Sequence, residues 1–228
     1  MLPPPAGNPI LRAMLLEPPR GREQQRLRAL LTKPPTEAAR GLLGQILVAG
    51  RGRQALAVRI VETEAYLGQS DPAAHVFHGR TPRTDPLWGP PGTIYVYFVY
   101  GMHHCLNLTA DRPGVPGCVL IRAAEPLPQT PLPRLSCRGP GRLCRTLGID
   151  TRLSGSNLFA SDASLTLRAG PAPMEVGVSP RVGIRLAAEE PLRFFDPESP
   201  AVSSPRFSLA RGRRAAPAPR RRTPRDGS

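Results

Sequence analysis

The middle of the chain shows the alternation of apolar and polar positions that is typical of β-strands. Residues 55–67 (ALAVRIVETEAYL) and 117–127 (GCVLIRAAEPL) are rich in β-branched and apolar residues and are bounded by Gly or Pro. Residues 92–107 (GTIYVYFVYGMHHCLN) alternate as far as Tyr100, break at Gly101 and continue as a second apolar run. We therefore predict a β-hairpin with Tyr100 near its tip, where a large exposed aromatic side chain needs a functional reason.

Helical patterns flank these strands. An Ala/Leu pattern that begins after Thr36 and stops around Gly44 or Gly50 predicts one helix. Residues 139–150 (GPGRLCRTLGID) predict a second helix, and residues 179–186 (SPRVGIRL) predict a further short strand. Residues 68–92 carry no such pattern, and a loop of this length in a compact domain is expected to be functional.

Composition divides the chain into three parts. Its 228 residues are enough for one sizeable core, so we predict a single domain, over residues 30–196. Residues 1–29 are rich in Pro and Arg and are expected to be a disordered or weakly helical extension. Residues 197–228 return to Pro, Ser and Arg and are expected to be a disordered basic tail.

The charge of the chain favours a polyanionic partner. Its net charge is +14, and residues 206–228 hold eight Arg against one Asp, so half of the excess lies in the tail. Arginine neutralises phosphates and releases their counterions, which makes nucleic acid the simplest partner. The alternative is a solvated tail without a partner.

Several classes of protein are disfavoured. The four cysteines show no CxxC spacing, so neither a zinc ribbon nor an iron–sulfur site is suggested, and buried free thiols are expected. The apolar patch at the amino end is too short for a signal peptide and no run reaches membrane-spanning length, so we expect a soluble intracellular protein. Lys33 is the one lysine, and amine nucleophiles are therefore nearly absent.

Two carboxylates and one guanidinium are the first candidates for chemistry. In residues 55–67, Glu62, Glu64 and Tyr66 fall on one face of the predicted strand, although a strand Glu is more often a solvated edge residue. Arg122 ends a run of four apolar residues, where an unpaired guanidinium would be costly to bury. It needs a carboxylate or a phosphate as its partner.

The histidines suggest a metal site as an alternative. His75 and His78 have HxxH spacing, and His103 and His104 stand next to Cys105, so a metal with Glu64 as base can be imagined. However, HxxH in a loop is common by chance, and adjacent strand side chains point to opposite faces. We expect no metal and no cofactor.

Several motifs, in order, resemble the alkyladenine (3-methyladenine, methylpurine) DNA glycosylase family. They are RIVETEAYLG, DPAAH, GRTPR, GTIYVYFVYGMHHCLN, VLIRAAEPL, GPGRLCRTLGI, RVGI and PLRF, and they run from about Thr36 to Phe195. The resemblance implies a mixed α+β single domain with a curved antiparallel sheet, surrounding helices and a protruding β-hairpin. It also implies a monomeric base excision repair enzyme, acting with DNA in the cytoplasm or nucleoid, that flips alkylated or deaminated purines out of the duplex and hydrolyses their N-glycosidic bond.

The resemblance further assigns roles to individual residues. Glu64 matches the general base that activates water, and Arg122 and the backbone carbonyl of Val182 match the other groups that hold this water. Tyr100 matches the side chain that wedges into the gap left by the flipped nucleotide. The base pocket is implied to contain Tyr66, His75, Tyr97 and Asn107, the last crowding the amine of guanine, and the DNA contacts to be Arg80, Thr81, Arg83, Met102, His103 and Arg142.

Physical reasoning agrees with these roles. Flipping costs a few kcal/mol of stacking, which an aromatic wedge offsets in part, and an aromatic pocket favours cationic alkylated purines. Arg122 is expected to keep Glu64 ionised, while Glu62 is expected to form a structural pair. Because an amine is needed to form a Schiff base, a chain with Lys33 alone is expected to be monofunctional and to use water.

Three departures from the family pattern leave alternatives open. Arg142 stands where the family usually has Lys, Leu87 and Trp88 replace the more usual Met and Phe, and residues 127–138 are short and rich in Pro. The short segment motivates a second hypothesis, a basic DNA-binding protein on the same scaffold without turnover. A metal-dependent hydrolase built on the histidines is a third.

Overall fold

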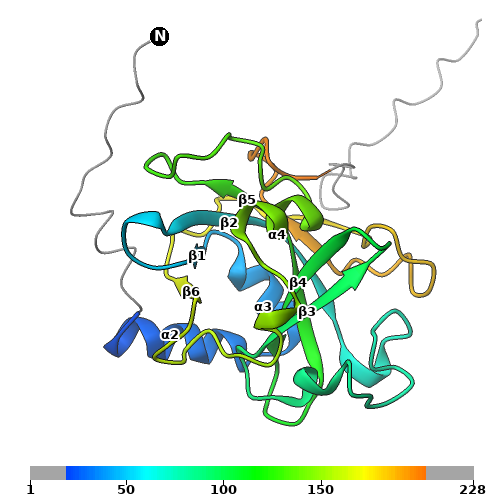
Figure 1. The fold of residues 1–228 in the computed structure, drawn as a ribbon. Helices are drawn as coiled ribbons and strands as arrows, with labels where there is room; N and C mark the ends of the chain where they lie inside the picture. Colours follow the sequence, from blue (N-terminus) through cyan, green and yellow to red (C-terminus); the bar gives the residue numbers. More distant parts are fainter. Residues whose placement is uncertain (1–18, 204–228) are drawn as a thin grey trace, which may run out of the picture.

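A curled antiparallel sheet forms the frame of the molecule (Figure 1). The structure is a computed structural model that describes residues 19–203. Within these residues the sheet has eight strands, six of them in the order β3-β4-β5-β2-β1-β6, while β8 pairs with β2 and β7. The strands are β1 Ile46–Ala49, β2 Leu56–Tyr66, β3 Ile94–Val99, β4 His103–Ala110, β5 Gly117–Pro126, β6 Leu165–Arg168, β7 Gly177–Ser179 and β8 Arg193–Phe195.

Strand β2 is the centre of this sheet because it pairs with three others. One edge of β2 is antiparallel to β5, and the other edge is shared between β1, opposite residues 56–59, and β8, opposite residues 62–64. The register with β5 shifts on either side of Glu62, which is the signature of a β-bulge. Both faces of β2 are covered at this point, so Glu62 and Glu64 are fully buried.

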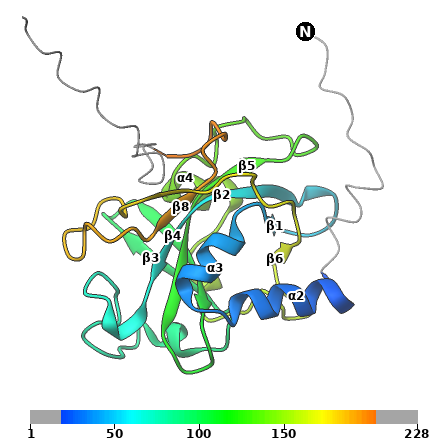
Figure 2. The same ribbon diagram turned by 180° about the vertical axis from the view of Figure 1, so that it is seen from behind.

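Three helices pack against the sheet in the described part of the chain: α2 Gly21–Leu31, α3 Pro35–Leu42 and α4 Pro140–Leu147. Figures 1 and 2 show α2 and α3 on one side of the sheet and α4 near β4 and β5. Proline opens both α3 and α4, where its missing N–H is not needed, and Gly148 ends α4 in the left-handed conformation. All three helices contribute to one apolar core with the sheet.

The fold class predicted from the sequence is confirmed: the chain forms a single domain of mixed α+β structure around a curled antiparallel sheet. Two elements differ from the prediction. The helix after Thr36 ends at Leu42, since residues 46–49 (ILVA) are a buried strand rather than a continuation toward Gly50. Residues 180–186 are not a strand. The Val182 N–H there donates to the Glu64 side chain, and the Arg181 side chain donates to the Ala65 carbonyl, so these groups contact β2 without forming a strand ladder. That the β3–β4 pair protrudes stays a prediction.

The structure also differs from the sequence interpretation near both ends of the chain. Helix α2 lies mostly within residues 1–29, where an extension was expected, and its Leu27 is buried in the core. Residues 197–203, which were assigned to the tail, come after β8, and their Ala201 and Val202 are buried against residues of the sheet. The remaining parts of the two expected extensions, 1–18 and 204–228, lie outside the described residues.

The helices of residues 19–203 are all too short or too polar to span a bilayer.

Candidate active site

A cavity of about 210 Å³ opens beside the connection between β3 and β4. Figures 1 and 2 agree in placing this connection, the loop that follows β2 and the loop that precedes β8 on one side of the molecule. These three segments, strands β2 to β5 and the connection between β4 and β5 supply the lining, in which four tyrosines and His75 stand beside smaller apolar residues. It includes Tyr66, His75, Tyr95, Tyr97, Tyr100, Asn107 and Gly183.

The cavity brings together the four residues expected to form a base pocket, Tyr66, His75, Tyr97 and Asn107. The rings of His75 and Tyr97 meet edge to face, with centroids 4.5 Å apart. The Nδ1 atom of His75 lies 3.0 Å from the hydroxyl of Tyr95, and Asn107 Nδ2 donates to the Tyr95 carbonyl at 3.2 Å. Tyr95 thus ties the two polar side chains of the pocket, a role that was not predicted.

The pocket walls are neutral. Burial lowers the pKa of His75, and the nearby charge of Arg83 lowers it further. Burial raises the pKa of Tyr97 and of Tyr66. Because the imidazole and both phenols are uncharged near neutral pH, their rings can contact either a neutral or a cationic base without repulsion.

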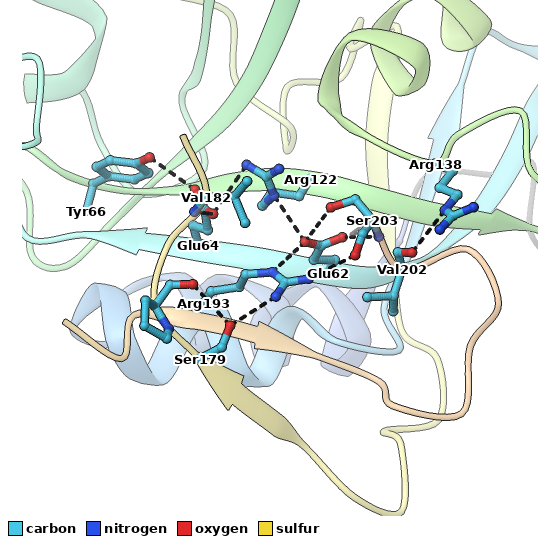
Figure 3. Close-up of polar contacts among 11 residues, drawn as sticks. Glu62, Glu64, Tyr66, Arg122, Arg138, Ser179, Val182, Arg193, Val202 and Ser203 are labelled. Atoms are coloured by element: carbon cyan, nitrogen blue, oxygen red, sulfur yellow. Dashed lines mark hydrogen bonds and ion pairs between the residues drawn. The ribbon is translucent and has the colours of Figure 1, made fainter. Parts of the chain in front are cut away.

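Glu64 contacts Tyr66, a residue of the cavity lining, and is held by two further donors (Figure 3). Its Oε1 accepts the N–H of Val182 at 2.8 Å and pairs with Arg122 Nη1 at 3.2 Å. Its Oε2 accepts the Tyr66 hydroxyl at 3.1 Å. These three donors fix the carboxylate from β2, from β5 and from the loop before β8, so three segments far apart in sequence meet on one side chain.

The N–H of Val182 contacts Glu64, whereas the resemblance assigned a role to the carbonyl of this residue. Residues 181–183 turn here instead of forming the expected strand, and Gly183 lies on the cavity lining with φ +78°. Val182 is therefore close to both the carboxylate and the cavity. A role for its carbonyl stays a prediction.

The donors around Glu64 differ in kind from those around Glu62. A carboxylate offers about four acceptor positions, two on each oxygen. Glu62 receives three donors on Oε1, from Arg122, Arg193 and the Ser203 hydroxyl, and one on Oε2, from the Ser203 N–H. Glu64 receives two donors on Oε1 and one on Oε2, the hydroxyl of Tyr66, within the described residues. Oε2 of Glu64 therefore keeps a position for a water molecule next to a residue of the cavity lining, whereas the donors of Glu62 come from residues that do not line the cavity.

The pKa of Glu64 is raised although Arg122 lies beside it. Burial raises the pKa of Glu64, and the lowering effects of Arg122, of the Val182 N–H and of the Tyr66 hydroxyl do not outweigh it. The negative charge of Glu62 raises this pKa as well. A carboxylate with a raised pKa is a stronger base once it is deprotonated, which suits proton abstraction from water.

A buried ion pair supports the outer face of Tyr66. The guanidinium of Arg181 lies 4.6 Å from the centre of this ring, and it pairs with Asp71 while donating to the Ala65 carbonyl at 3.0 Å. Asp71 also accepts the backbone N–H of Leu67 and of Ala73. This pair joins the loop after β2 to the loop before β8 and supports the ring whose hydroxyl contacts Glu64.

Tyr100 stands at the connection between β3 and β4. Residues 99–102 form a β-turn in which the N–H of Met102 donates to the Val99 carbonyl at 3.3 Å, and both Tyr100 (φ +53°) and Gly101 (φ +66°) are left-handed. Tyrosine is uncommon at positive φ, since its Cβ crowds the backbone. Its side chain is 81% exposed, yet it borders the cavity. The strained conformation thus presents an aromatic ring to solvent at the cavity mouth.

The residues expected to contact DNA lie at the surface. Arg80, which is exposed, pairs with Asp85 at 2.6 Å and has its guanidinium 5.4 Å from the ring centre of Trp88. The ring of His103 packs against Gly141 at the start of α4, where a Cβ would approach it to 2.8 Å. The other exposed members of the set are Thr81, Arg83, Met102 and Arg142.

Neither the metal-site alternative nor cysteine chemistry gains support from the described residues. No group of three or more His, Cys, Asp or Glu side chains within residues 19–203 could hold a metal ion. Cys105, Cys118, Cys137 and Cys144 are free and buried, and burial raises the pKa of each thiol.

The sequence interpretation missed Arg181, Arg193 and Ser203, which support the site from residues far along the chain. Arg193 in PLRFF carries the same signal that drew attention to Arg122, a guanidinium within an apolar run. Ser203 carries no such signal, because a serine in a segment rich in Pro and Ser is indistinguishable from its neighbours.

Comparisons with known proteins show which family the chain resembles. The family model "Methylpurine-DNA glycosylase (MPG)" matches residues 29–200. A protein of Myxococcus xanthus is 44% identical over 75% of this chain and 89% of its own length, one of Rhodococcus jostii is 43% identical over 76% and 82%, and one of Methanocella arvoryzae is 41% identical over 75% and 92%. Each is named "Putative 3-methyladenine DNA glycosylase".

Proposed function

Because the chain belongs to the methylpurine-DNA glycosylase family and is thus a DNA glycosylase, a hydrolase acting on N-glycosyl bonds, we propose that it excises damaged purines from duplex DNA with a water molecule activated by Glu64. The observation that carries this proposal is the carboxylate of Glu64, buried behind an aromatic cavity, held by three donors and left with one acceptor position. DNA is its substrate; alkylated and deaminated purines are the proposed lesions.

The proposed reaction begins with a nucleotide flipped out of the helix, since a base inside the stack cannot reach a buried carboxylate. The purine enters between Tyr66, His75 and Tyr97, and Asn107 at the back of the pocket crowds the exocyclic amine of an undamaged guanine. Tyr100 fills the gap in the duplex. Edge-to-face packing of His75 on Tyr97 keeps the pocket walls in place for a flat ring.

The proposed chemical step needs only water as the nucleophile and Glu64 as the base. Glu64 accepts a proton from water, the water oxygen forms a bond to C1′ of the sugar, and the bond between C1′ and the purine nitrogen breaks. The electron pair of that bond leaves with the base. Arg122 faces the carboxylate through Nη1 and provides positive charge beside it as the proton arrives.

A reaction through an amine has no support in the site. Lys33 pairs with Glu37 at 3.5 Å on the connection between α2 and α3, is more than half exposed, and does not line the cavity. We therefore propose a monofunctional enzyme.

A duplex with one hypoxanthine or one ethenoadenine tests the proposed function. We expect pure protein to release the base and leave an abasic site in an intact strand, with or without a chelator. Binding without release would favour the DNA-binding alternative, and release that the chelator abolishes would favour a metal-dependent hydrolase. Strand cleavage without added base or heat would contradict monofunctional action.

The Arg-rich tail is expected to contribute to non-specific DNA binding. We propose that the glycosylase domain is longer than residues 30–196 and also includes α2 and residues 197–203. Residues 206–228 then contribute positive charge for DNA binding and no catalytic group. Deleting residues 206–228 should weaken binding to undamaged duplex and lower the slope of log K against log salt by roughly 0.9 for each lost phosphate contact. Single-turnover excision at saturating protein should change little. An unchanged slope would show that the tail is merely solvated.

A further inference from the structure

The carboxylate of Glu62 is the hub of a buried network that extends behind the proposed catalytic group (Figure 3). Its Oε1 accepts Arg193 Nε at 2.6 Å, Ser203 Oγ at 2.8 Å and Arg122 Nε at 3.1 Å. Its Oε2 accepts the backbone N–H of Ser203 at 2.7 Å. Glu62 and Arg193 are fully buried, and Arg122 nearly so. The hub is therefore sealed from solvent on the side away from the cavity.

Arg122 is shared between the two carboxylates. Its Nε contacts Glu62 and its Nη1 contacts Glu64, so the planar guanidinium is fixed at two corners. Arg122 is buried and is not among the residues that line the cavity. Its orientation toward Glu64 consequently depends on where Glu62 is held.

Residues after β8 determine where Glu62 is held. Ser203 donates twice to this carboxylate, and its carbonyl accepts Arg193 Nη2 at 3.1 Å. Arg138 Nε donates to the neighbouring Val202 carbonyl at 3.1 Å, which anchors the segment to the chain that follows β5. Arg193 is fixed in turn by the Ser179 hydroxyl at 3.0 Å. Ser203 therefore completes the set of donors around Glu62.

We propose that Glu62 and Ser203 are positioning residues for the reaction, because the two Ser203 donors fix the Glu62 carboxylate and Glu62 holds Arg122 against Glu64. The chain must then continue through Ser203, immediately before the Arg-rich tail, for the proposed catalytic centre to be complete. This inference rests on the proposed function, in which Glu64 is the base.

A purely structural role for Glu62 makes a different prediction from a positioning role. Four charged side chains meet here, two carboxylates and two guanidiniums, and the charge of Glu62 is one of the causes that raise the pKa of Glu64. Removing this charge leaves Glu64 facing a net positive surrounding, which favours its ionised form. The charged and titratable groups that face Glu64 are Glu62 and Tyr66 of β2, Tyr97 of β3, Cys105 of β4, Arg122 of β5 and Arg181 of the loop before β8.

The test measures single-turnover excision at saturating protein from pH 4 to 8, with thermal unfolding, for wild type, Ser203→Ala, Ser203→Thr and Glu62→Gln. Ser203→Ala removes one of four donors and should slow excision about three- to tenfold without weakening DNA binding, and Ser203→Thr should restore most of the rate. Glu62→Gln should slow excision by more and move its acid limb to lower pH.

Arg59→Gln is the matched control. Arg59 also ties the segment after β8 to the sheet, through Asp196 at 2.8 Å and Glu125 at 2.7 Å, but it makes no contact with Glu62 or Glu64. It should lose stability without losing excision. The inference would be overturned if Ser203→Ala excised the base at the wild-type rate, or if its excision rate fell no more than that of Arg59→Gln. If Glu62→Gln does not fold, the two serine variants decide the question. If Glu64→Gln retained excision, the proposed function would fail instead.

Discussion

Glu64→Gln is expected to bind a duplex that carries a lesion and to release no measurable base. Glutamine has nearly the same shape and can still accept the Val182 N–H, so the site keeps its form. Its amide cannot take the proton of the attacking water, and loss of a general base typically costs on the order of a hundredfold or more in rate. The measurement is single-turnover excision of hypoxanthine at saturating protein, with affinity for the same duplex measured in parallel.

The control for this variant is Asp71→Asn, which alters a buried carboxylate near the cavity that is saturated by Arg181 and two backbone N–H groups. It should reduce stability, and its excision should fall far less than that of Glu64→Gln. Excision by Glu64→Gln at near wild-type rate would remove Glu64 from its proposed role. Parallel losses in the two variants would indicate a general sensitivity of the cavity.

Tyr100→Asn is expected to slow excision of a well-paired lesion by about tenfold or more, since a base stacked on an aromatic ring is worth about 1–3 kcal/mol. Asparagine tolerates the positive φ that strains tyrosine here, so the variant should unfold at the same or a higher temperature, with a gain of about 1 kcal/mol at most. Slower excision from a more stable protein would separate the wedge function from folding.

The same lesion in paired and mismatched contexts gives the decisive comparison for Tyr100. A mismatched base costs less to flip, so Tyr100→Asn should slow its excision least. Tyr97→Ser, in the strand that leads to Tyr100, is the matched variant, and it should slow both contexts because it damages a pocket wall that both substrates meet. Equal slowing of both contexts by Tyr100→Asn, or a marked loss of stability, would make Tyr100 a packing residue.

The apolar and β-branched content of residues 55–67 and 117–127 is sufficient to predict β2 and β5, because strands at the centre of a sheet are long and largely buried. The short strands β6 and β8 have three or four residues each, which is too few for a period to be recognised. The failure at residues 179–186 has another cause. Backbone groups there bind Glu64 rather than a neighbouring strand, and pattern alone cannot show which partner a backbone N–H takes.

The parts of the candidate site that are formed by residues close together in the sequence were predictable. The parts that depend on residues far apart in the sequence were not. Glu64 and Tyr66 share a strand, and the aromatic run of β3 is visible as a cluster. The different roles of the two glutamates were not predictable, since Glu62 is held by Arg193 and Ser203, which lie 131 and 141 residues further along the chain. The raised pKa of Glu64 also required the structure, because the burial that outweighs Arg122 is a property of the fold.

The contact of Arg80 with Trp88 allows the intrinsic fluorescence of the protein to report on DNA binding. Trp88 is the one tryptophan of the chain, and the Arg80 guanidinium lies above its ring beside the lining residue Leu87. Indole fluorescence responds to the charge and polarity around the ring. A phosphate that draws Arg80 away would therefore change the emission, so docking on DNA can be followed in stopped flow without a label, on the same sample in which base release is timed.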